Sequence, residues 1–131
     1  MQYSLAVRNA QNDAAAATVG PSPMLEIRTG EPPPNCDSPD TGILIAVGKL
    51  PQDWMTQSAD AMMQRNGQWQ AVGTLAAAEI PGGHFRIKQG TSCHLQGTFG
   101  PGMEMRPTGA GLIAPGQVVK IQQFFITRGN A

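Results

Sequence analysis

The sequence has little charge, few aromatic residues and only two cysteines. Of its 131 residues 14% are charged and 5% are aromatic, and nine basic residues balance nine acidic ones. A net charge of zero gives no general attraction to nucleic acid or to anionic membranes, so we expect neither as a partner. The length fits one domain and excludes a barrel enzyme of about 250 residues.

Long apolar runs are also missing. No stretch of about 18 apolar residues is present, so we expect no membrane-spanning helix. The N-terminal segment has no basic start followed by an apolar core, so we expect no secretory signal and synthesis in the cytoplasm. Cytoplasmic disulfides are rare, which makes Cys36 and Cys93 two free, buried thiols in the main interpretation. The alternative is one disulfide that closes a long loop.

Glycine and proline are abundant instead. The chain has 16 glycines and 11 prolines, well above average usage, and is therefore rich in turns. A protein with many turns, little charge and no net charge is prone to self-association. This composition suits a protein that packs against copies of itself or against a partner.

The first segment is rich in alanine and predicts a helix from Ser4 to Val19, ended by Gly20 and Pro21. The helix has only a thin apolar stripe, so it must dock tightly on another surface to be stable. Two interpretations remain open, a helix packed within the domain and an arm that reaches a neighbouring subunit. The stripe consists of Leu5, Val7, Ala10, Ala14 and Ala17.

After this segment the apolar period changes to two, which indicates β-strands. The run 42–48 is apolar on both faces and predicts a central strand. Asn66-Gly67 predicts a hairpin between 61–65 and 68–73, because both turn positions favour positive φ. In a further strand we expect one face to carry Cys93, Leu95 and Phe99.

These strands, about seven or eight of them, are short and are separated by turns. We therefore predict a mainly all-β fold, an antiparallel β-sandwich or jelly-roll-like domain with a short N-terminal helix. The domain spans residues 1–131, with residues 1–20 as its helical segment or arm. The other expected strands are 24–29, 84–89, 93–99 and 117–127.

Residues with catalytic or ligand-binding potential do not cluster in the sequence. No phosphate-binding glycine motif is present, and the only histidines are His84 and His94. Cys93 and His94 are neighbours in an expected strand and would point to opposite faces, which disfavours both a shared metal and a Cys-His dyad. We predict no catalytic, cofactor-binding or metal-binding residues, no cofactor and no enzymatic activity. An enzyme would need a pocket that joins both histidines to a carboxylate.

Several segments, taken in order, carry a family resemblance. They resemble the capsid cement, or decoration, proteins of tailed bacteriophages, in the form found in Bordetella-type short-tailed phages. The resemblance covers nearly the whole chain, and its motifs are turns and strand starts that specify a fold more than a task. The segments are 4–10, 25–30, Pro32-Pro33, Asn35-Cys36, 40–42, 53–55, 67–69, 84–87, 93–98 and 116–119.

The resemblance implies a virion structural protein without catalytic residues. Such a protein is made in the host cytoplasm and sits on the capsid exterior, where it clamps neighbouring major capsid proteins. The implied partners are the major capsid protein and a second copy of the chain, as a homodimer or other homo-oligomer. Alternatives are another virion component, such as a tail-tube, neck or fibre-base protein, and a soluble ligand-binding sandwich with Trp54 and Trp69 exposed for stacking.

The two ends of the chain are the expected contact surface, because terminal segments and edge strands are natural docking elements. We predict that the protein interface includes Met1, Gln2, Tyr3, Ser4, Leu5, Val7, Arg128, Gly129, Asn130 and Ala131.

Overall fold

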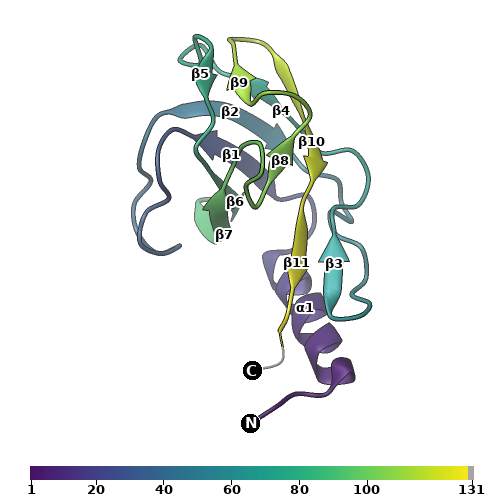
Figure 1. The fold of residues 1–131 in the computed structure, drawn as a ribbon. Helices are drawn as coiled ribbons and strands as arrows, with labels where there is room; N and C mark the ends of the chain where they lie inside the picture. Colours follow the sequence, from purple (N-terminus) through teal and green to yellow (C-terminus); the bar gives the residue numbers. More distant parts are fainter. Residues whose placement is uncertain (130–131) are drawn as a thin grey trace.

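The chain folds into a mainly β structure with one helix, as a computed structural model that describes residues 1–129 shows (Figure 1). The predicted all-β, sandwich-like fold with a short N-terminal helix is confirmed. The elements are α1 (Leu5–Val19), β1 (Met24–Arg28), β2 (Leu44–Lys49), β3 (Met62–Gln64), β4 (Gln70–Gly73), β5 (Ile80–Pro81), β6 (His84–Gln89), β7 (Ser92–Thr98), β8 (Arg106–Pro107), β9 (Leu112–Ile113), β10 (Val118–Gln123) and β11 (Phe125–Thr127).

Seven strands form one curled antiparallel sheet in the order β7-β6-β1-β2-β4-β10-β8. Ile45 and Ala46 point to opposite faces of β2 and are both fully buried, so the prediction of a central strand covered on both sides is confirmed. On β1, Leu25 and Ile27 are also fully buried, in agreement with the period-two pattern. The core continues through aromatic side chains, among them Trp69, Phe85, Phe99 and Phe124.

Two further sheets have two strands each, β11-β3 and β5-β9. The β3-β11 ribbon and α1 project together from one end of the large sheet, so the first described residues and the segment after β11 lie at that end (Figure 1). We call α1, β3 and β11 the terminal lobe.

The predicted hairpin at Asn66-Gly67 is wrong. β3 pairs with β11, while β4 pairs with β2 and β10 in the large sheet. Of the two turn residues only Gly67 has a positive φ, at 71°. The Asn66 backbone N–H donates to the Trp54 backbone carbonyl at 2.8 Å. The Asn66 side-chain Nδ2 donates to the Asp53 backbone carbonyl, also at 2.8 Å. The segment therefore connects two sheets.

The prediction that Cys93, Leu95 and Phe99 share one face is also wrong. In the β6-β7 pairing Leu95 lies opposite Ile87, but Cys93 lies opposite Lys88, so the register shifts between them. This β-bulge adds one residue to β7 and turns Cys93 to the other face of the sheet. Phe99 follows the end of β7 and is buried.

Candidate docking surface at the terminal lobe

The helix of the lobe has the limits that the sequence predicts. Ser4 is its N-cap, and the Ser4 hydroxyl accepts a hydrogen bond from the Val7 backbone N–H at 3.2 Å. Gly20 ends the helix with a φ of 89°, a left-handed value that glycine adopts readily.

α1 is attached to the rest of the chain through polar side chains. Asn12 is fully buried, and its Nδ2 donates to Ser58 Oγ at 3.1 Å and to the Ala61 carbonyl at 3.0 Å. Asn9 Oδ1 accepts from Ser58 Oγ and from the Ala61 backbone N–H, both at 2.8 Å. Asp13 Oδ1 accepts from the Ser58 backbone N–H at 2.8 Å. Three carboxamide or carboxylate groups thus clamp the 58–61 turn onto the helix.

The helix packs within the domain, but its predicted apolar stripe does not face the rest of the domain. Leu5 and Val7 are each 43% exposed, and the alanines of the stripe are exposed as well. The polar clamp holds the other side of the helix, with Val19 buried at its end. The apolar stripe of α1 is therefore left on the surface of the lobe.

The β3-β11 ribbon adds two further exposed apolar side chains. Met63 and Ile126 lie opposite each other on the two strands. Met63 belongs to the core, and Ile126 packs against it. Met62 and Phe125 lie on the opposite face of the ribbon and are 42% and 43% exposed. Neither residue is among the predicted interface residues; for Phe125 the available signal was the unbroken apolar run 124–126, which must expose one side chain on a strand covered on a single face.

The structure brings the two predicted contact segments to the same end of the molecule (Figure 1). Arg8 Nη1 donates to the Arg128 carbonyl at 3.5 Å, which joins the start of α1 to the segment after β11. Residues 1–7, with Met1 almost fully exposed, and residues 128–129 lie at the surface. Asn130 and Ala131 lie outside the described residues. That these segments bind a partner stays a prediction.

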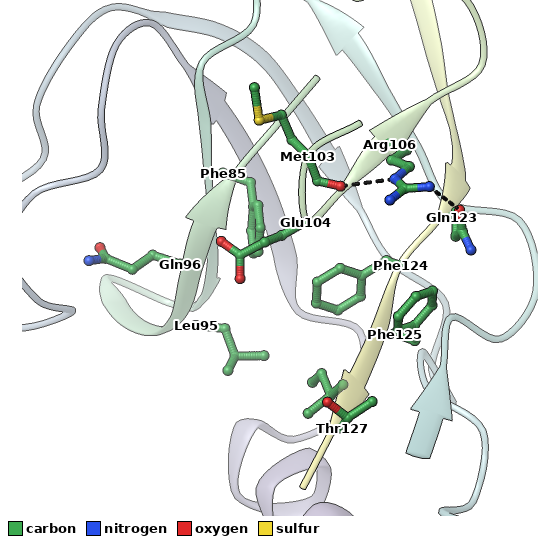
Figure 2. A pocket seen from close by; sticks show the side chains of 11 residues that line it. Phe85, Leu95, Gln96, Met103, Glu104, Arg106, Gln123, Phe124, Phe125 and Thr127 are labelled. Carbon is green, nitrogen blue, oxygen red and sulfur yellow. Dashed lines mark hydrogen bonds between the residues drawn. The ribbon is translucent and has the colours of Figure 1, made fainter. Parts of the chain in front are cut away.

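A groove of about 420 Å³ separates the ribbon from the sheet. Figure 2 shows Phe85 and Leu95 on one side of it and Phe124 on the other, with the Phe125 ring beyond the strand that carries both phenylalanines. The Phe85 and Phe124 rings meet edge to face with centroids 5.4 Å apart, which fixes the floor of the groove. Arg106 lies on the rim, where its Nη1 donates to Gln123 Oε1 at 3.1 Å and its Nε to the Met103 carbonyl at 3.1 Å. The groove is apolar at its floor and polar at its rim.

A charged cluster lies on the outer face of the sheet, away from the lobe. Asp40 in the β1-β2 loop accepts hydrogen bonds from Lys88 Nζ at 2.7 Å, from Arg28 Nη2 at 3.2 Å and from Arg86 Nη1. Glu26 Oε1 is 3.0 Å from Lys88 Nζ and 3.0 Å from Arg28 Nε. The hydrogen bond from Lys88, followed by that from Arg86, holds the pKa of Asp40 below its usual value against the opposing effect of burial. The cluster fastens the loop to β1 and β6.

The histidines and cysteines lie outside the lobe. His84 is fully buried, with Nδ1 2.9 Å from the Gly30 carbonyl, and His94 is exposed at the other end of the β6-β7 hairpin. Within residues 1–129 no three His, Cys, Asp or Glu side chains are grouped so that they could hold a metal ion. Cys36 and Cys93 are free, but they are half-buried, so the expectation of two buried thiols is wrong in this respect.

Both tryptophans lie in the core, 3% exposed at Trp54 and fully buried at Trp69. Trp54 Nε1 donates to the Gly20 carbonyl at 3.1 Å, and Trp69 Nε1 donates to the Trp54 carbonyl at 3.0 Å. The ligand-binding alternative required these rings to be exposed for stacking, and their burial counts against it.

Comparison with known proteins finds no matching family model, no matching curated protein and no matching solved structure. In the described part of the chain no helix is long and apolar enough to cross a membrane.

Proposed function

We propose that the chain is a virion structural protein of a tailed bacteriophage, a capsid cement protein. It binds the outer surface of the icosahedral shell, clamps neighbouring major capsid proteins and acts as a homodimer or other homo-oligomer. The observation that supports this function is the terminal lobe, which projects from the sheet and carries exposed apolar side chains from three separate elements.

A surface of this kind is typical of a docking site. Apolar side chains that are exposed on a projecting element are costly in water and gain free energy when a partner covers them. The lobe offers Val7 from α1, Met62 from β3 and Phe125 from β11. The helix is held from its other side by the Asn9, Asn12 and Asp13 contacts, so the lobe can present its surface without losing its attachment.

The zero net charge also favours a role in a dense assembly. A strongly charged decoration protein would repel its own copies when many of them crowd on one shell. A chain with nine basic and nine acidic residues avoids this repulsion. Its contacts then depend on apolar area and hydrogen bonds, which salt screens much less than long-range charge attraction.

The proposal can be tested by co-sedimentation of the purified protein with shells of the same virus that were assembled without it. Val7→Glu places a charge on the exposed stripe of α1, and we expect it to weaken shell binding about tenfold or more. Leu75→Glu is the matched control, because Leu75 is 95% exposed on the turn after β4, in the sheet body. Wild-type binding by Leu75→Glu and weak binding by Val7→Glu support the proposal. Equal binding by both variants would contradict it.

A further inference from the structure

The two cysteines, far apart in sequence, meet on the outer face of the sheet. The bulge in β7 places Cys93 opposite Lys88 and therefore on the face that carries the charged cluster. Cys36 reaches the same place from the β1-β2 loop, where its carbonyl accepts a hydrogen bond from Arg86 Nη2 at 2.8 Å. Both cysteines line the same cavity, and Cys93 is among the groups that raise the pKa of Cys36. The fold thus brings two cysteines that are far apart in the sequence together as a dithiol.

This dithiol is accessible from solvent. Both cysteines are half-buried and line an open cavity of about 370 Å³ together with Ser38, Thr91 and Ser92. A small tripeptide-sized reagent can therefore reach the sulfur atoms without unfolding of the sheet.

The surroundings give the two thiols different roles. Burial, the hydrogen bond to Cys93 and the charge of Cys93 raise the pKa of Cys36 to about 11. Cys93 Sγ donates to the Leu95 carbonyl at 3.3 Å, and the nearly buried Arg86 lines the same cavity. Thiolates are the attacking species in disulfide exchange, so the raised pKa of Cys36 disfavours it as the first attacker and leaves that role to Cys93.

We propose that Cys36 and Cys93 form a reversible disulfide by exchange with a small-molecule disulfide of the glutathione type. The Cys93 thiolate attacks one sulfur of the oxidant, which forms a mixed disulfide and releases one thiolate. Cys36 then loses its proton to water and attacks the Cys93 sulfur, which releases the second small thiol. Two protein thiols are oxidised and one small disulfide is reduced to two thiols. The bond ties the β1-β2 loop covalently to β7.

The disulfide would act as a lock on the loop that covers the charged cluster. At present that loop is held by ion pairs of Asp40 and by backbone contacts of Arg86. A bond that closes a long loop restricts the unfolded chain most strongly, so oxidation stabilises the fold. The reduced form is expected in a reducing cytoplasm and the locked form after release into oxidising surroundings.

The test titrates the full-length protein with mixtures of oxidised and reduced glutathione and traps remaining thiols by alkylation before mass spectrometry. We expect an intramolecular Cys36–Cys93 peptide link, reversed by dithiothreitol. We also expect the folded protein to be half-oxidised at a ratio of oxidised to reduced glutathione that is about tenfold or more below the ratio needed for the urea-unfolded chain. The reason is that the fold holds the two thiols together. Equal ratios for folded and unfolded protein, a linked dimer, or two separate glutathione adducts would overturn the proposal.

Single variants test the order of attack. Cys36→Ser should accumulate one glutathione on Cys93, because the second attack is lost. Cys93→Ser should react slowly with glutathione disulfide at Cys36, because burial raises the pKa of that thiol and leaves little of it as thiolate. Both variants keep two-atom side chains, and a far-ultraviolet spectrum checks that they remain folded. Equal rates at the two cysteines would overturn the assignment of Cys93 as the attacking thiol.

Discussion

At the scale of single residues, Asp40 organises most of the outer face of the sheet. Its carboxylate bonds to Lys88, Arg28 and Arg86, and Arg86 is 2% exposed. Removal of this carboxylate leaves a nearly buried guanidinium with only backbone carbonyls as acceptors, and a buried charge that loses its partner is costly.

We expect Asp40→Asn to lower the free energy of unfolding at pH 7 by about 2 kcal/mol, less than a fully buried pair would give, since Asp40 is one-third exposed. The folded pKa of Asp40 lies below its unfolded value of about 3.9, so its stabilisation is fully present above that pH. Stabilisation is lost as the pH falls through the folded pKa. Urea denaturation from pH 2 to pH 7 should therefore show a steeper acid loss in wild type than in the variant.

Asp37→Asn is the control for this prediction, because it removes the same charge from an exposed position of the same loop. It should unfold close to wild type over the whole pH range. Wild-type stability of Asp40→Asn at pH 7 would show that the cluster does not stabilise the fold.

At the scale of elements, the attachment of α1 depends on hydrogen bonds more than on apolar contact. Asn12→Ala removes both donors to the 58–61 turn and leaves the Ala61 carbonyl without its Asn12 partner. We expect a loss of about 2 kcal/mol in the free energy of unfolding. We also expect faster hydrogen exchange in α1, with little change in β1 and β2.

Thr18→Ala is the matched variant on the same helix, because Thr18 is exposed and its hydroxyl donates only within α1, to the Ala14 carbonyl at 2.7 Å. It should leave helix exchange unchanged. Equal exchange rates in Asn12→Ala and wild type would mean that the polar clamp does not hold the lobe together.

Local patterns predict the elements well and their partners poorly. The alternation around Leu25 and Ile27 identifies β1, and the alanine-rich run ended by Gly20 and Pro21 identifies α1, because these signals depend on neighbouring residues. Asn66-Gly67 is misleading, since β3 finds its partner β11 at the far end of the chain. Pairing over such a distance depends on the packing of the whole core, which no local pattern encodes.

The candidate site was predictable only in outline. The termini were expected at a contact surface, and the structure joins the start of α1 to Arg128 at the same end of the molecule. The exposed side of α1 could not be predicted, because an alanine-rich helix has a weak apolar stripe and the buried side is chosen by Asn9, Asn12 and Asp13. Polar docking of this kind is visible only when the 58–61 turn is in place.

At the scale of the whole molecule, the proposed function requires a neutral β domain whose projecting lobe docks on a repeating shell. Each bound copy would be stabilised by mass action, because the partner binds only the folded lobe. Cement proteins repeat with the shell lattice, whereas neck and fibre-base proteins occupy a few special positions. The number of copies per particle therefore separates the proposed function from its virion alternatives.

The most direct test is the copy number of this chain in purified particles, measured by quantitative mass spectrometry against the major capsid protein. The proposed function predicts a ratio of roughly one to one, as expected when every lattice position carries its own copy. A ratio of about a few per hundred would assign the chain to a neck, tail or fibre base, and absence from the particles would contradict a virion role altogether.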